Sequence, residues 1–558
     1  MHYHISYSNP HRHFIKITIQ TIEVNSEQFM LQLPSWRPGR YELGNFAKNI
    51  RDFHVSDQFG AELQFEKLSK DLWQIQATKG KILTISYLYY ANEVNAGSCF
   101  VDDHLFYVNP IQCCMYNPGT EHESLTLSLD YPKEYNISLP DSLKSEDTYV
   151  FDNFDLLVES PFLASATLHK LSYQIEGYDV MFNIWFEGVE KIPTDRILED
   201  FKKFTQLQLE YFGSFPTKEY DFIFLITPFK SYHGVEHTAS TVITLGPDKE
   251  LFEPKMYREF LHISSHELYH TWNIKALRPS EMKPYDLSKE NYSKLGFWYE
   301  GLTTLMGDLI LWESGVFDDK AWNACLDGYL KVHYFNHGHL HLSVADSSFD
   351  TWLDGYQIGI PNRKVSIYQD GALCMLMIHA AIQLKSNKAE SLHSVMRTLY
   401  ENKEVLNKGF SEAFLKQTLV EAGGEMVQNI LNSYVYGTED YIVGILDVCD
   451  YLGWTLVLED NDDLFSGVLG IQVANSKNGV KVIKSIEGGL ADTHGIAVGD
   501  SILSINGVQS TADMELNSEK GIYQLQVETK YKSLNVEIIA NEENRIGYKV
   551  YKIDCIQD

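Results

Sequence analysis

The chain of 558 residues has few of the features that mark membrane, disulfide-stabilised or nucleic-acid-binding proteins. It has no run of about 18 or more apolar residues, which excludes an ordinary transmembrane helix. Its seven cysteines are scattered and odd in number, so they outline no disulfide framework. Basic residues are also scarce: 46 Lys and Arg against 76 Asp and Glu give a formal net charge of -30. This charge disfavours nucleic acid and anionic membranes as partners and favours ligands that carry a positive group.

The first residues, Met1-His2-Tyr3-His4-Ile5, also lack the basic and apolar regions of an export signal. We therefore expect a cytoplasmic protein, or a periplasmic one if a signal peptide has been removed. The adjacent pair Cys113-Cys114 has no second cysteine pair at ligand spacing. We interpret both as core residues in preference to a metal or redox site.

The pentapeptide His266-Glu267-Leu268-Tyr269-His270 is the most informative feature that the sequence does contain. If residues 264–272 form one helix, the two histidines stand one turn apart on the same face and can reach one ion. Zinc in hydrolases takes three protein ligands and leaves a fourth position for water. Glu300, on a second predicted helix, supplies the third ligand. The sequence therefore predicts one catalytic zinc ion per chain, held by His266, His270 and Glu300.

The alternative is that this short pattern occurs by chance, since the chain has 20 histidines and a helical pair can simply decorate a surface. Chance does not explain Glu300. Its segment has apolar residues at helical spacing, so the acid would lie on a largely buried helix, and a buried carboxylate needs a cation. With zinc bound, Glu267 is expected to take the proton of the zinc-activated water and pass it to the leaving amine. A tyrosine hydroxyl would serve as a second donor to the oxyanion.

The length of the chain predicts two to four domains, and the pattern of its apolar residues changes twice along the sequence. Alternating runs at 14–19, 82–87 and 125–129 predict a β-sandwich-like domain over residues 1–172. Strands at 221–226 and 241–245, followed by helices near 256–273, 297–313, 367–385 and 390–402, predict an α/β part and then a helical part over residues 173–455. The fold class is therefore multidomain α+β, with the zinc motif in the middle domain.

Residues 464–545 return to short strands and turns. Gly499-Asp500-Ser501-Ile502-Leu503-Ser504-Ile505-Asn506-Gly507 contains a tight-turn signal and resembles a PDZ domain. The resemblance implies that Val468-Leu469-Gly470-Ile471 is the loop whose backbone amides receive the carboxylate of a peptide C-terminus. The alternative, left open, is that this module only packs against the catalytic domain.

The zinc helix and its exit, His266-Glu267-Leu268-Tyr269-His270-Thr271-Trp272-Asn273-Ile274-Lys275-Ala276-Leu277-Arg278-Pro279, resemble the glycyl aminopeptidase family of zinc metallopeptidases, which are of the gluzincin type. Leu33-Pro34-Ser35-Trp36-Arg37-Pro38-Gly39-Arg40-Tyr41, Phe46-Ala47-Lys48-Asn49-Ile50 and Ser347-Ser348-Phe349-Asp350-Thr351-Trp352 are similar to other parts of that family, so the resemblance covers nearly the whole chain. It implies a thermolysin-like catalytic domain that removes N-terminal residues, preferably glycine and alanine.

Two further site residues follow from that resemblance. Gly234-Val235-Glu236-His237 is similar to the family's Gly-Leu-Glu-His stretch, which implies that Glu236 holds the free amine of the substrate, with Gly234 in the same substrate-binding stretch. A fixed carboxylate there would reject an internal peptide segment. Tyr368-Gln369-Asp370-Gly371-Ala372 is similar to the Tyr-x-Lys-Gly-Ala motif of related aminopeptidases, which implies that Tyr368 stabilises the oxyanion. The alternatives are an ordinary strand-end glutamate and a buried aromatic at a helix start.

The sequence departs from the family pattern at two of these places. His233 stands where the family usually has a glycine, and its side chain could narrow the substrate cleft. Asp370 replaces the usual lysine after the tyrosine, and the reversed charge could shift specificity or the pH optimum.

Other histidines compete for attention. His262 lies four residues before His266, but it is about 12 Å of helical rise from His270, so these three cannot hold one ion. We interpret it as a structural residue or as one that supports a zinc ligand without binding the ion. The cluster His337-Gly338-His339-Leu340-His341 is expected to be a loop that binds metal only adventitiously. Asp308 and Asn273 are candidates for orienting the zinc histidines.

These observations favour a zinc aminopeptidase acting on peptides with a free N-terminus. A zinc endopeptidase is the alternative within the same class, and cleavage of an acetylated peptide would identify it. A PDZ-based peptide-binding protein with an inactive peptidase scaffold is the alternative from a different class, although all three ligands and the base are present.

Overall fold

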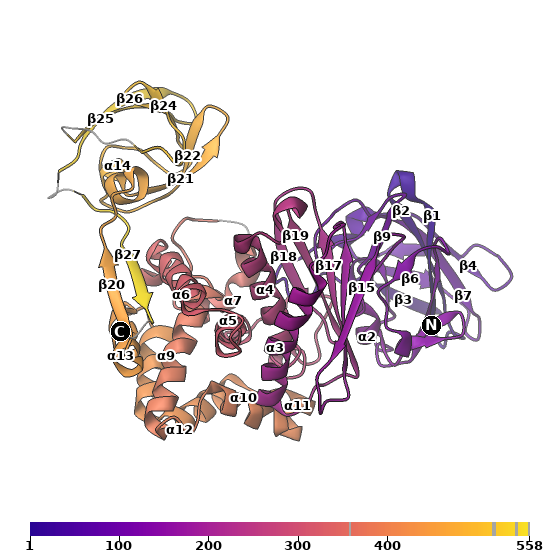
Figure 1. Ribbon diagram of the computed structural model, residues 1–558. Coiled ribbons are helices and arrows are strands. Elements are labelled where there is room, and N and C mark those ends of the chain that lie inside the picture. The colour runs from indigo at the N-terminus through magenta and orange to yellow at the C-terminus, as the bar shows by residue number, and fades with distance from the viewer. Residues whose placement is uncertain (357–358, 516–520, 542–544, 556–558) are drawn as a thin grey trace.

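A computed structural model describes residues 1–356, 359–515, 521–541 and 545–555. Three regions follow one another along the chain in Figure 1: N-terminal strands, a central sheet with many helices, and a C-terminal β unit. The predicted multidomain α+β fold is confirmed. Within the described residues, no helix combines the length and apolar character needed to cross a bilayer.

The N-terminal region consists of three sheets of seven, four and three strands. Side chains of its long strands alternate between core and surface; along β7, Leu83, Ile85, Tyr87 and Tyr89 are buried and the residues between them are less so. The strands predicted at 14–19, 82–87 and 125–129 are confirmed as β2, β7 and β10. The strands of this region are β1 (His2–Asn9), β2 (Phe14–Gln20), β3 (Gln28–Gln32), β4 (Ile50–Asp57), β5 (Phe65–Lys67), β6 (Leu72–Gln76), β7 (Leu83–Tyr90), β8 (Phe100–Val101), β9 (Leu105–Val108), β10 (Leu125–Asp130), β11 (Asn136–Ile137), β12 (Lys144–Ser145), β13 (Thr148–Phe151) and β14 (Phe162–Ser165).

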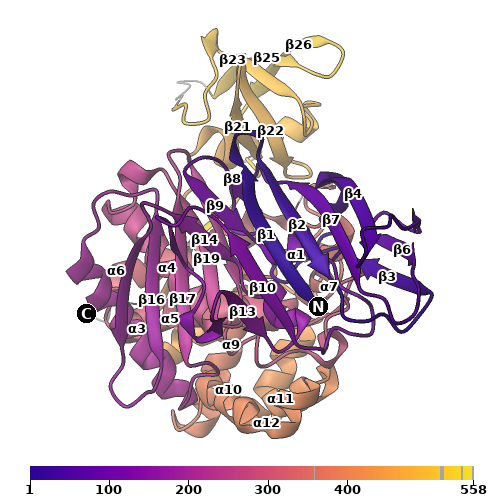
Figure 2. The same cartoon turned by 90° about the vertical axis from the view of Figure 1, so that its right-hand side faces the viewer.

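A five-stranded mixed sheet begins the central region, in the order β15-β16-β17-β19-β18. Its middle strands are parallel and nearly all buried, since the N-terminal region covers one face and helices cover the other. Figure 2 shows β9 and β14 beside β19, where residues of all three share one apolar cluster. β18 lies at the edge, with one side unpaired. The strands are β15 (His169–Gln174), β16 (Met181–Glu187), β17 (Glu219–Ile226), β18 (Ser231–Glu236) and β19 (Ser240–Gly246).

The helices of the central region pack around α9, which is buried on all sides from Asp370 to Ile382. A helix that is apolar all round belongs in a core, and α9 contacts α5, α6, α12 and α13. The longer helices are α3 (Thr194–Phe212), α4 (Pro254–Tyr269), α5 (Thr303–Glu313), α6 (Asp319–Tyr334), α9 (Gln369–Ser386), α10 (Leu392–Glu401), α12 (Glu412–Ile430) and α13 (Ile442–Leu452). The shorter ones are α1 (Pro110–Cys113), α2 (Phe154–Val158), α7 (Val344–Phe349), α8 (Thr351–Asp354), α11 (Lys403–Lys408) and, in the C-terminal unit, α14 (Leu490–Thr493).

Two predicted helices differ from the structure in detail. The zinc helix α4 starts with Pro254 at its first position and ends at Tyr269, so that His270 caps it instead of lying inside it. The segment predicted as one helix over 297–313 begins with a π-helical turn, η6 (Phe297–Leu302), and continues as α5. π-helical turns are rare and are found mostly at functional sites, and this one carries Glu300.

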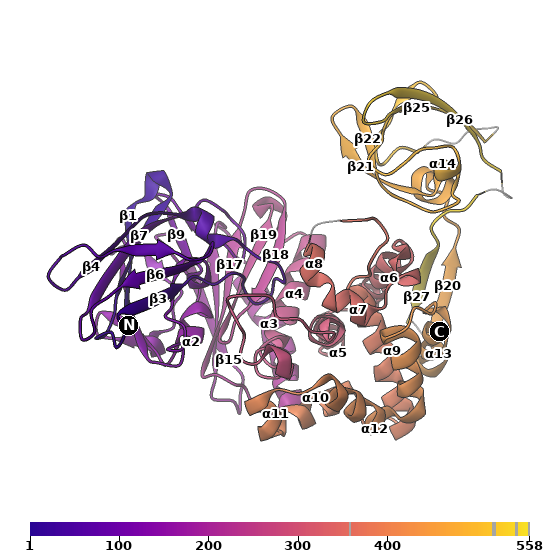
Figure 3. The ribbon, with the colours of Figure 1, turned by 180° about the vertical axis from the view of Figure 1, so that it is seen from behind.

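The C-terminal unit is a small β domain joined to the helices through the antiparallel pair β20 (Thr455–Glu459) and β27 (Val550–Asp554) (Figures 1 and 3). β27 packs on α6, where the Ile553 amide donates to Asp327 Oδ1 at 2.9 Å. Asn506 and Gly507 both have positive φ, which confirms the predicted tight turn. The strands are β21 (Ile471–Ser476), β22 (Gly479–Ser485), β23 (Ser501–Ile505), β24 (Val508–Gln509), β25 (Ile522–Glu528) and β26 (Ser533–Ile539).

Candidate active site

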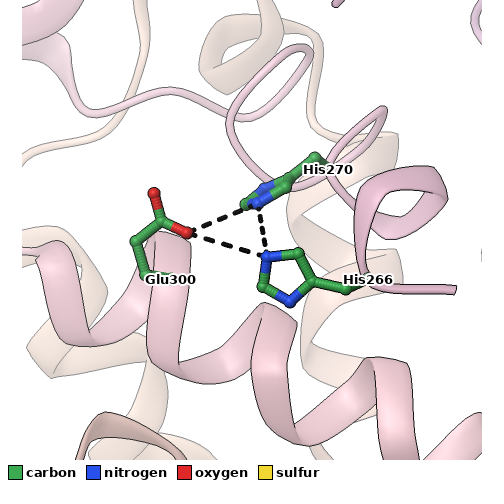
Figure 4. A group of neighbouring side chains, drawn as sticks. All are labelled: His266, His270 and Glu300. Atoms are coloured by element: carbon green, nitrogen blue, oxygen red, sulfur yellow. Dashed lines mark hydrogen bonds and ion pairs between the residues drawn. The ribbon is translucent and has the colours of Figure 1, made fainter. Parts of the chain in front are cut away.

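Three side chains converge where α4 meets the turn η6 (Figure 4). The Nε2 atoms of His266 and His270 are 3.0 Å apart. Glu300 Oε2 lies 3.4 Å from His270 Nε2 and 3.9 Å from His266 Nε2. His270 and Glu300 are each 2% exposed. The three residues expected as zinc ligands are therefore brought together in a buried cluster.

Neighbouring groups fix the orientation of two of these side chains. His270 Nδ1 donates to the backbone carbonyl of Asn273 at 2.9 Å, which leaves the Nε2 lone pair pointing into the cluster. The Tyr41 hydroxyl donates to Glu300 Oε1 at 3.2 Å. Asn273, expected to orient a zinc histidine, thus does so through its backbone, while its side chain donates to Trp298 O and Thr303 Oγ1.

Two more carboxylates adjoin the cluster. Glu236, Glu267 and His270 offer ligand atoms within 4.8 Å of one another. Burial, opposed by His270, raises the pKa of Glu267 to about 8, and burial also raises the pKa of Glu300. Although burial alone would lower it, with no ion bound the Glu300 carboxylate raises the pKa of His270 to about 10. An ion at this place would displace the Nε2 proton and take the lone pair. Packing so many buried acids into one place costs free energy that a bound cation would relieve.

This donor set fits a zinc ion. Two imidazoles and one carboxylate from a second helix are a ligand combination of catalytic zinc sites, which keep a further position open. The locked tautomer of His270 presents a lone pair to the ion, as a ligand must. The rival group with Glu236 and Glu267 has only one histidine, so the set with His266 suits zinc better.

Gly234 explains how the edge strand can run so close to the zinc helix. A Cβ atom at this position would lie 2.1 Å from Glu267 Oε1, far inside van der Waals contact. Only glycine therefore fits between β18 and Glu267. At the end of the same strand, Glu236 is 4% exposed, and its Oε1 atom has no hydrogen-bond partner within the part of the chain that the structure describes.

A loop of the N-terminal region, residues 36–41, packs against Glu236 and His233. Gly39, at φ 77°, packs so tightly that a Cβ there would lie 2.3 Å from Glu236 Oε2. Arg37 is 5% exposed, and its Nη2 lies 3.1 Å from His233 Nε2. Trp36 anchors the loop by donating from Nε1 to the Asp286 carbonyl at 2.8 Å. The loop therefore fills the space on this side of Glu236.

Tyr368 stands just before α9 with its hydroxyl 3.3 Å from the Tyr356 hydroxyl. Burial, and then the carboxylate of Glu300, raise the pKa of Tyr368 well above its usual value, which keeps the phenol protonated and able to donate. The tyrosine expected to face the reaction thus lies within electrostatic reach of Glu300, and Glu236 acts on it as well.

The two departures from the family pattern are accounted for by their contacts. His233 turns away from the zinc helix toward Arg37, and burial together with Arg37 lowers its pKa to about 3, so it is neutral. Asp370 is fully buried on α9, where Oδ1 pairs with His333 Nδ1 at 2.6 Å. Its charge is offset inside the helical core and is not presented to the cleft.

Two other histidines considered from the sequence, His262 and His339, have structural partners. His262 Nδ1 pairs with Asp308, and Asp308 also accepts from the Tyr329 hydroxyl. Asp308 therefore orients His262 and not a zinc histidine. In the cluster His337–His341, His339 stacks on His333 with ring centroids 4.4 Å apart and binds the Asn336 carbonyl through Nδ1. This stretch is a short 3-10 helix rather than an open loop.

The cysteines and the loop expected to bind a peptide carboxylate have structural contacts of their own. All seven cysteines are free, and Cys113 and Cys114 are buried in the N-terminal core, as interpreted from the sequence. In the loop 468–471, the Val468 and Gly470 amides donate to the carbonyls of Asp463 and Phe465. A peptide carboxylate would have to replace these bonds.

Sequence reasoning missed the part that the N-terminal region plays in this site. Arg37, Gly39 and Tyr41 supported only a family resemblance, yet they touch His233, Glu236 and Glu300. The one signal available was local: a proline and a glycine beside arginine and tyrosine mark a tight loop with large polar side chains. Nothing in the sequence indicated where that loop would dock.

Three family models match the chain. Residues 2–166 match the Peptidase M61 N-terminal domain, residues 259–374 match M61 glycyl aminopeptidase, and residues 455–522 match the PDZ domain. The chain belongs to the M61 glycyl aminopeptidase family. As an M61 peptidase it is a metallopeptidase, and the predicted resemblance to this family and to PDZ domains is confirmed.

The architecture of this M61 peptidase recurs in a solved structure. An aminopeptidase N family protein from Idiomarina loihiensis aligns over 99% of this chain and 98% of its own, with a TM-score of 0.89 and 24% identity, which shows a common fold. An M1 zinc metallopeptidase from Deinococcus radiodurans aligns over 79% of this chain and 94% of its own, with a TM-score of 0.48 and 12% identity. A variant of it bound to a Tyr-Ser-Ala substrate aligns equally well. No curated protein matches the chain.

Proposed function

We propose that this M61 peptidase is a zinc aminopeptidase that hydrolyses the first peptide bond of substrates with a free N-terminus and prefers small residues such as glycine and alanine. The observation that carries the proposal is Glu236, a buried carboxylate beside the zinc-ligand cluster, one oxygen of which has no hydrogen-bond partner among the described residues. An ammonium group would pair with that oxygen and remove the cost of leaving it unsatisfied.

The closed end of the cleft favours an exopeptidase over an endopeptidase. A bound peptide would pair along the free edge of β18 and reach Glu236, where Gly39 and Arg37 leave no path for further residues. An acylated or longer N-terminal segment would have to displace the loop 36–41 and bury the Glu236 charge without a partner.

His266, His270 and Glu300 would hold one zinc ion per chain. When bound, zinc supplies Lewis-acid polarisation of the scissile carbonyl and lowers the pKa of water. Tyr41 holds Glu300, and Asn273 O holds His270, so both ligands are oriented in advance.

Glu267 is the proton carrier in the proposed reaction. Water adds its oxygen to the carbonyl carbon, Glu267 accepts the proton that water releases, and the same carboxyl group returns a proton to the nitrogen as the C–N bond breaks. The products are a free amino acid and a peptide shortened by one residue. The Tyr368 hydroxyl donates to the oxygen on which negative charge develops.

The preference for small residues rests on the family resemblance and is supported by crowding. Three tyrosines, Tyr41, Tyr356 and Tyr368, all lie within electrostatic reach of the Glu300 carboxylate. Rings gathered this close to Glu300 would leave room for only a small side chain on the first residue.

Hydrolysis of glycyl- and alanyl-p-nitroanilide by the wild type and by Glu267→Gln, with N-acetylated substrates as controls, tests this proposal. We expect cleavage of the free-amine substrates only, and a loss of at least about 100-fold in kcat in the variant, since general acid–base catalysis contributes that much. Zinc content, measured on both proteins by mass spectrometry, should be one per chain. Equal cleavage of the acetylated substrates would contradict the aminopeptidase assignment.

A further inference from the structure

The edge strand β18 defines two ends of the substrate cleft. Side chains at every second position of a strand share one face, so Tyr232, Gly234 and Glu236 all face the zinc helix. Gly234 lies over Glu267, and Glu236 lies beside His270. Tyr232 therefore marks the end opposite to the proposed amine anchor.

A cavity of 340 Å³ lies at the Tyr232 end, between α4 and α6. The Tyr232 phenol is within electrostatic reach of Asp308 and Glu259, which both line this cavity. Gln369, the neighbour of Tyr368, lines it as well. The cavity is thus bordered by residues next to the candidate reaction centre, and the site described above does not use it.

One polar end of the cavity adjoins the zinc ligands. The imidazole of His262 is one helical turn from His266, with ring centroids 6.5 Å apart. Asp308 holds His262 through Nδ1 and is itself held by the Tyr329 hydroxyl, so the orientation of the ring is fixed. The charged groups Lys255, Arg258 and Glu259 also line the cavity.

The other wall of the cavity is apolar and contains small residues that leave room for a ligand. Side chains from α6 and the turn before it form it, and two positions, Ala324 and Gly328, are small and exposed. A Cβ atom at Gly328 would meet no atom within 4 Å, so the backbone of α6 leaves open room there. The apolar lining residues are Phe317, Ala321, Ala324, Cys325, Gly328 and Val332.

The direction in which a peptide runs along β18 decides which of its residues reaches this cavity. If the proposed function holds, the amine lies at Glu236 and the scissile carbonyl lies at His266, His270 and Glu300. A peptide paired along β18 then continues from the carbonyl toward Tyr232. The residue that follows the scissile bond is the one that arrives at the cavity.

We propose that the cavity between α4 and α6 binds the side chain of the residue following the scissile bond and selects for bulky apolar or aromatic residues there. This inference rests on the proposed function and goes beyond it, because it concerns the leaving residue. A volume of 340 Å³ is within the range of small-ligand pockets and is too large for glycine or alanine to fill. Burying a leucine or phenylalanine side chain would stabilise binding by the apolar area removed from water.

Gly328→Leu tests the proposal, since Gly328 lines the cavity and a Cβ atom there would meet no atom within 4 Å, which leaves room for a larger side chain to extend into the space. Gly328→Ala is the matched control, because it makes the same glycine replacement in a helix and adds only one carbon. The substrates are Ala-Gly, Ala-Ala, Ala-Leu and Ala-Phe. In the wild type we expect kcat/KM for Ala-Leu and Ala-Phe to exceed that for Ala-Gly by about tenfold or more.

Gly328→Leu should abolish that tenfold preference, mainly by raising KM, and Gly328→Ala should retain it. Binding can be measured without turnover by calorimetry on the zinc-loaded Glu267→Gln variant. Adding Gly328→Leu to this variant should weaken the binding of Ala-Phe and leave the binding of Ala-Gly unchanged. A wild type that treats all four dipeptides alike, or a Gly328→Leu variant that weakens all four equally, would overturn the inference while leaving the aminopeptidase intact. If the wild type cleaves none of the four, nor alanyl-p-nitroanilide, the proposed function itself fails and the inference falls with it.

Discussion

Several carboxylates of this M61 peptidase are buried with one oxygen that accepts no hydrogen bond from the described residues. Glu236 and Glu267 both keep an oxygen without a hydrogen-bond partner in the described part of the chain. Asp221, outside the site, is similar: Oδ1 accepts from Asn183 and Trp185 at 2.9 Å each, and Oδ2 has no partner among the described residues. The proposed cation and substrate amine would account for the first two, whereas no such role is proposed for Asp221.

Asp221→Asn is therefore predicted to stabilise the protein at alkaline pH. Burial, opposed by those two donors, raises the pKa of Asp221 to about 7, against about 3.9 in an unfolded chain. Between these values the folded state holds a proton that the unfolded state lacks, so stability falls as pH rises toward 7. Above pH 7 the wild type should carry a penalty of about 4 kcal/mol, which asparagine avoids.

Urea unfolding midpoints at pH 5 and pH 8 check this prediction, with Asp450→Asn as an exposed control. We expect Asp221→Asn to raise the midpoint clearly at pH 8 and much less at pH 5. An equal effect at both pH values would show that the carboxylate is not protonated in the folded protein.

The element that delivers Glu300 depends on a contact between two glycines. A Cβ on Gly301 would lie 2.5 Å from the Gly371 Cα, and one on Gly371 would lie 2.8 Å from the Gly301 Cα. The turn η6 therefore crosses α9 with the two backbones in contact. This crossing sets the position of Glu300 on one side and of Tyr368, just before α9, on the other.

Gly371→Ala is expected to push η6 away from α9. Overpacking of this kind typically costs about 1–3 kcal/mol, and the displacement of Glu300 should weaken zinc binding by about tenfold or more. Thermal unfolding and a competition assay with a zinc chelator measure the two effects. Gly328→Ala on α6, where the Cβ has open space, should instead leave zinc affinity unchanged. A Gly371→Ala variant with normal zinc affinity would show that the crossing does not control the site.

Periodicity predicted these elements well and their contacts poorly. The strands β2, β7, β10, β17 and β19 and the helices α9 and α10 lie close to their predicted ranges because their apolar residues recur at a regular spacing. The π-helical turn at Phe297–Leu302 was not predicted, because it follows from the Gly301–Gly371 contact between segments far apart in sequence. The cluster of His266, His270 and Glu300 could be predicted, because the two histidines lie one turn apart on the same segment.

The candidate site draws on two regions of the molecule, because the N-terminal region contacts the site residues of the central region. Besides the loop 36–41, a buried ion pair crosses this boundary: Glu159 Oε2 lies 2.6 Å from Lys275 Nζ, which belongs to the exit of the zinc helix. His237, next to Glu236, lies 3.7 Å from the same oxygen. Docking of the two regions and formation of the site are therefore linked.

Glu159→Gln is predicted to destabilise this boundary by about 3–5 kcal/mol, because it leaves Lys275 buried without a counter-charge. Although burial opposes ionisation, Lys275 holds the pKa of Glu159 well below its usual value. The pair thus stabilises the fold above the unfolded pKa of about 4.3, and the contribution is lost as pH falls toward the lower folded value. Unfolding at pH 7 and pH 3 should show a large difference between wild type and variant at pH 7 and a smaller one at pH 3.

The exposed pair of Glu199 and Lys203, 2.8 Å apart, is the control. Glu199→Gln should leave the free energy of unfolding nearly unchanged at either pH, since exposed ion pairs are screened by water and salt. If Glu159→Gln behaved in the same way, the buried pair would not hold the two regions together.

The most direct test of the account follows a ten-residue peptide and its N-acetylated twin by mass spectrometry, with zinc-loaded wild type and with Glu236→Gln. We predict that the wild type shortens the free peptide one residue at a time from its N-terminus and leaves the acetylated peptide whole. Glu236→Gln, with zinc still bound, should slow the free peptide by about 10- to 100-fold, since one charge-assisted contact is lost. Internal fragments, or equal cleavage of both peptides, would contradict the claim that a buried glutamate at a closed cleft selects the amino terminus.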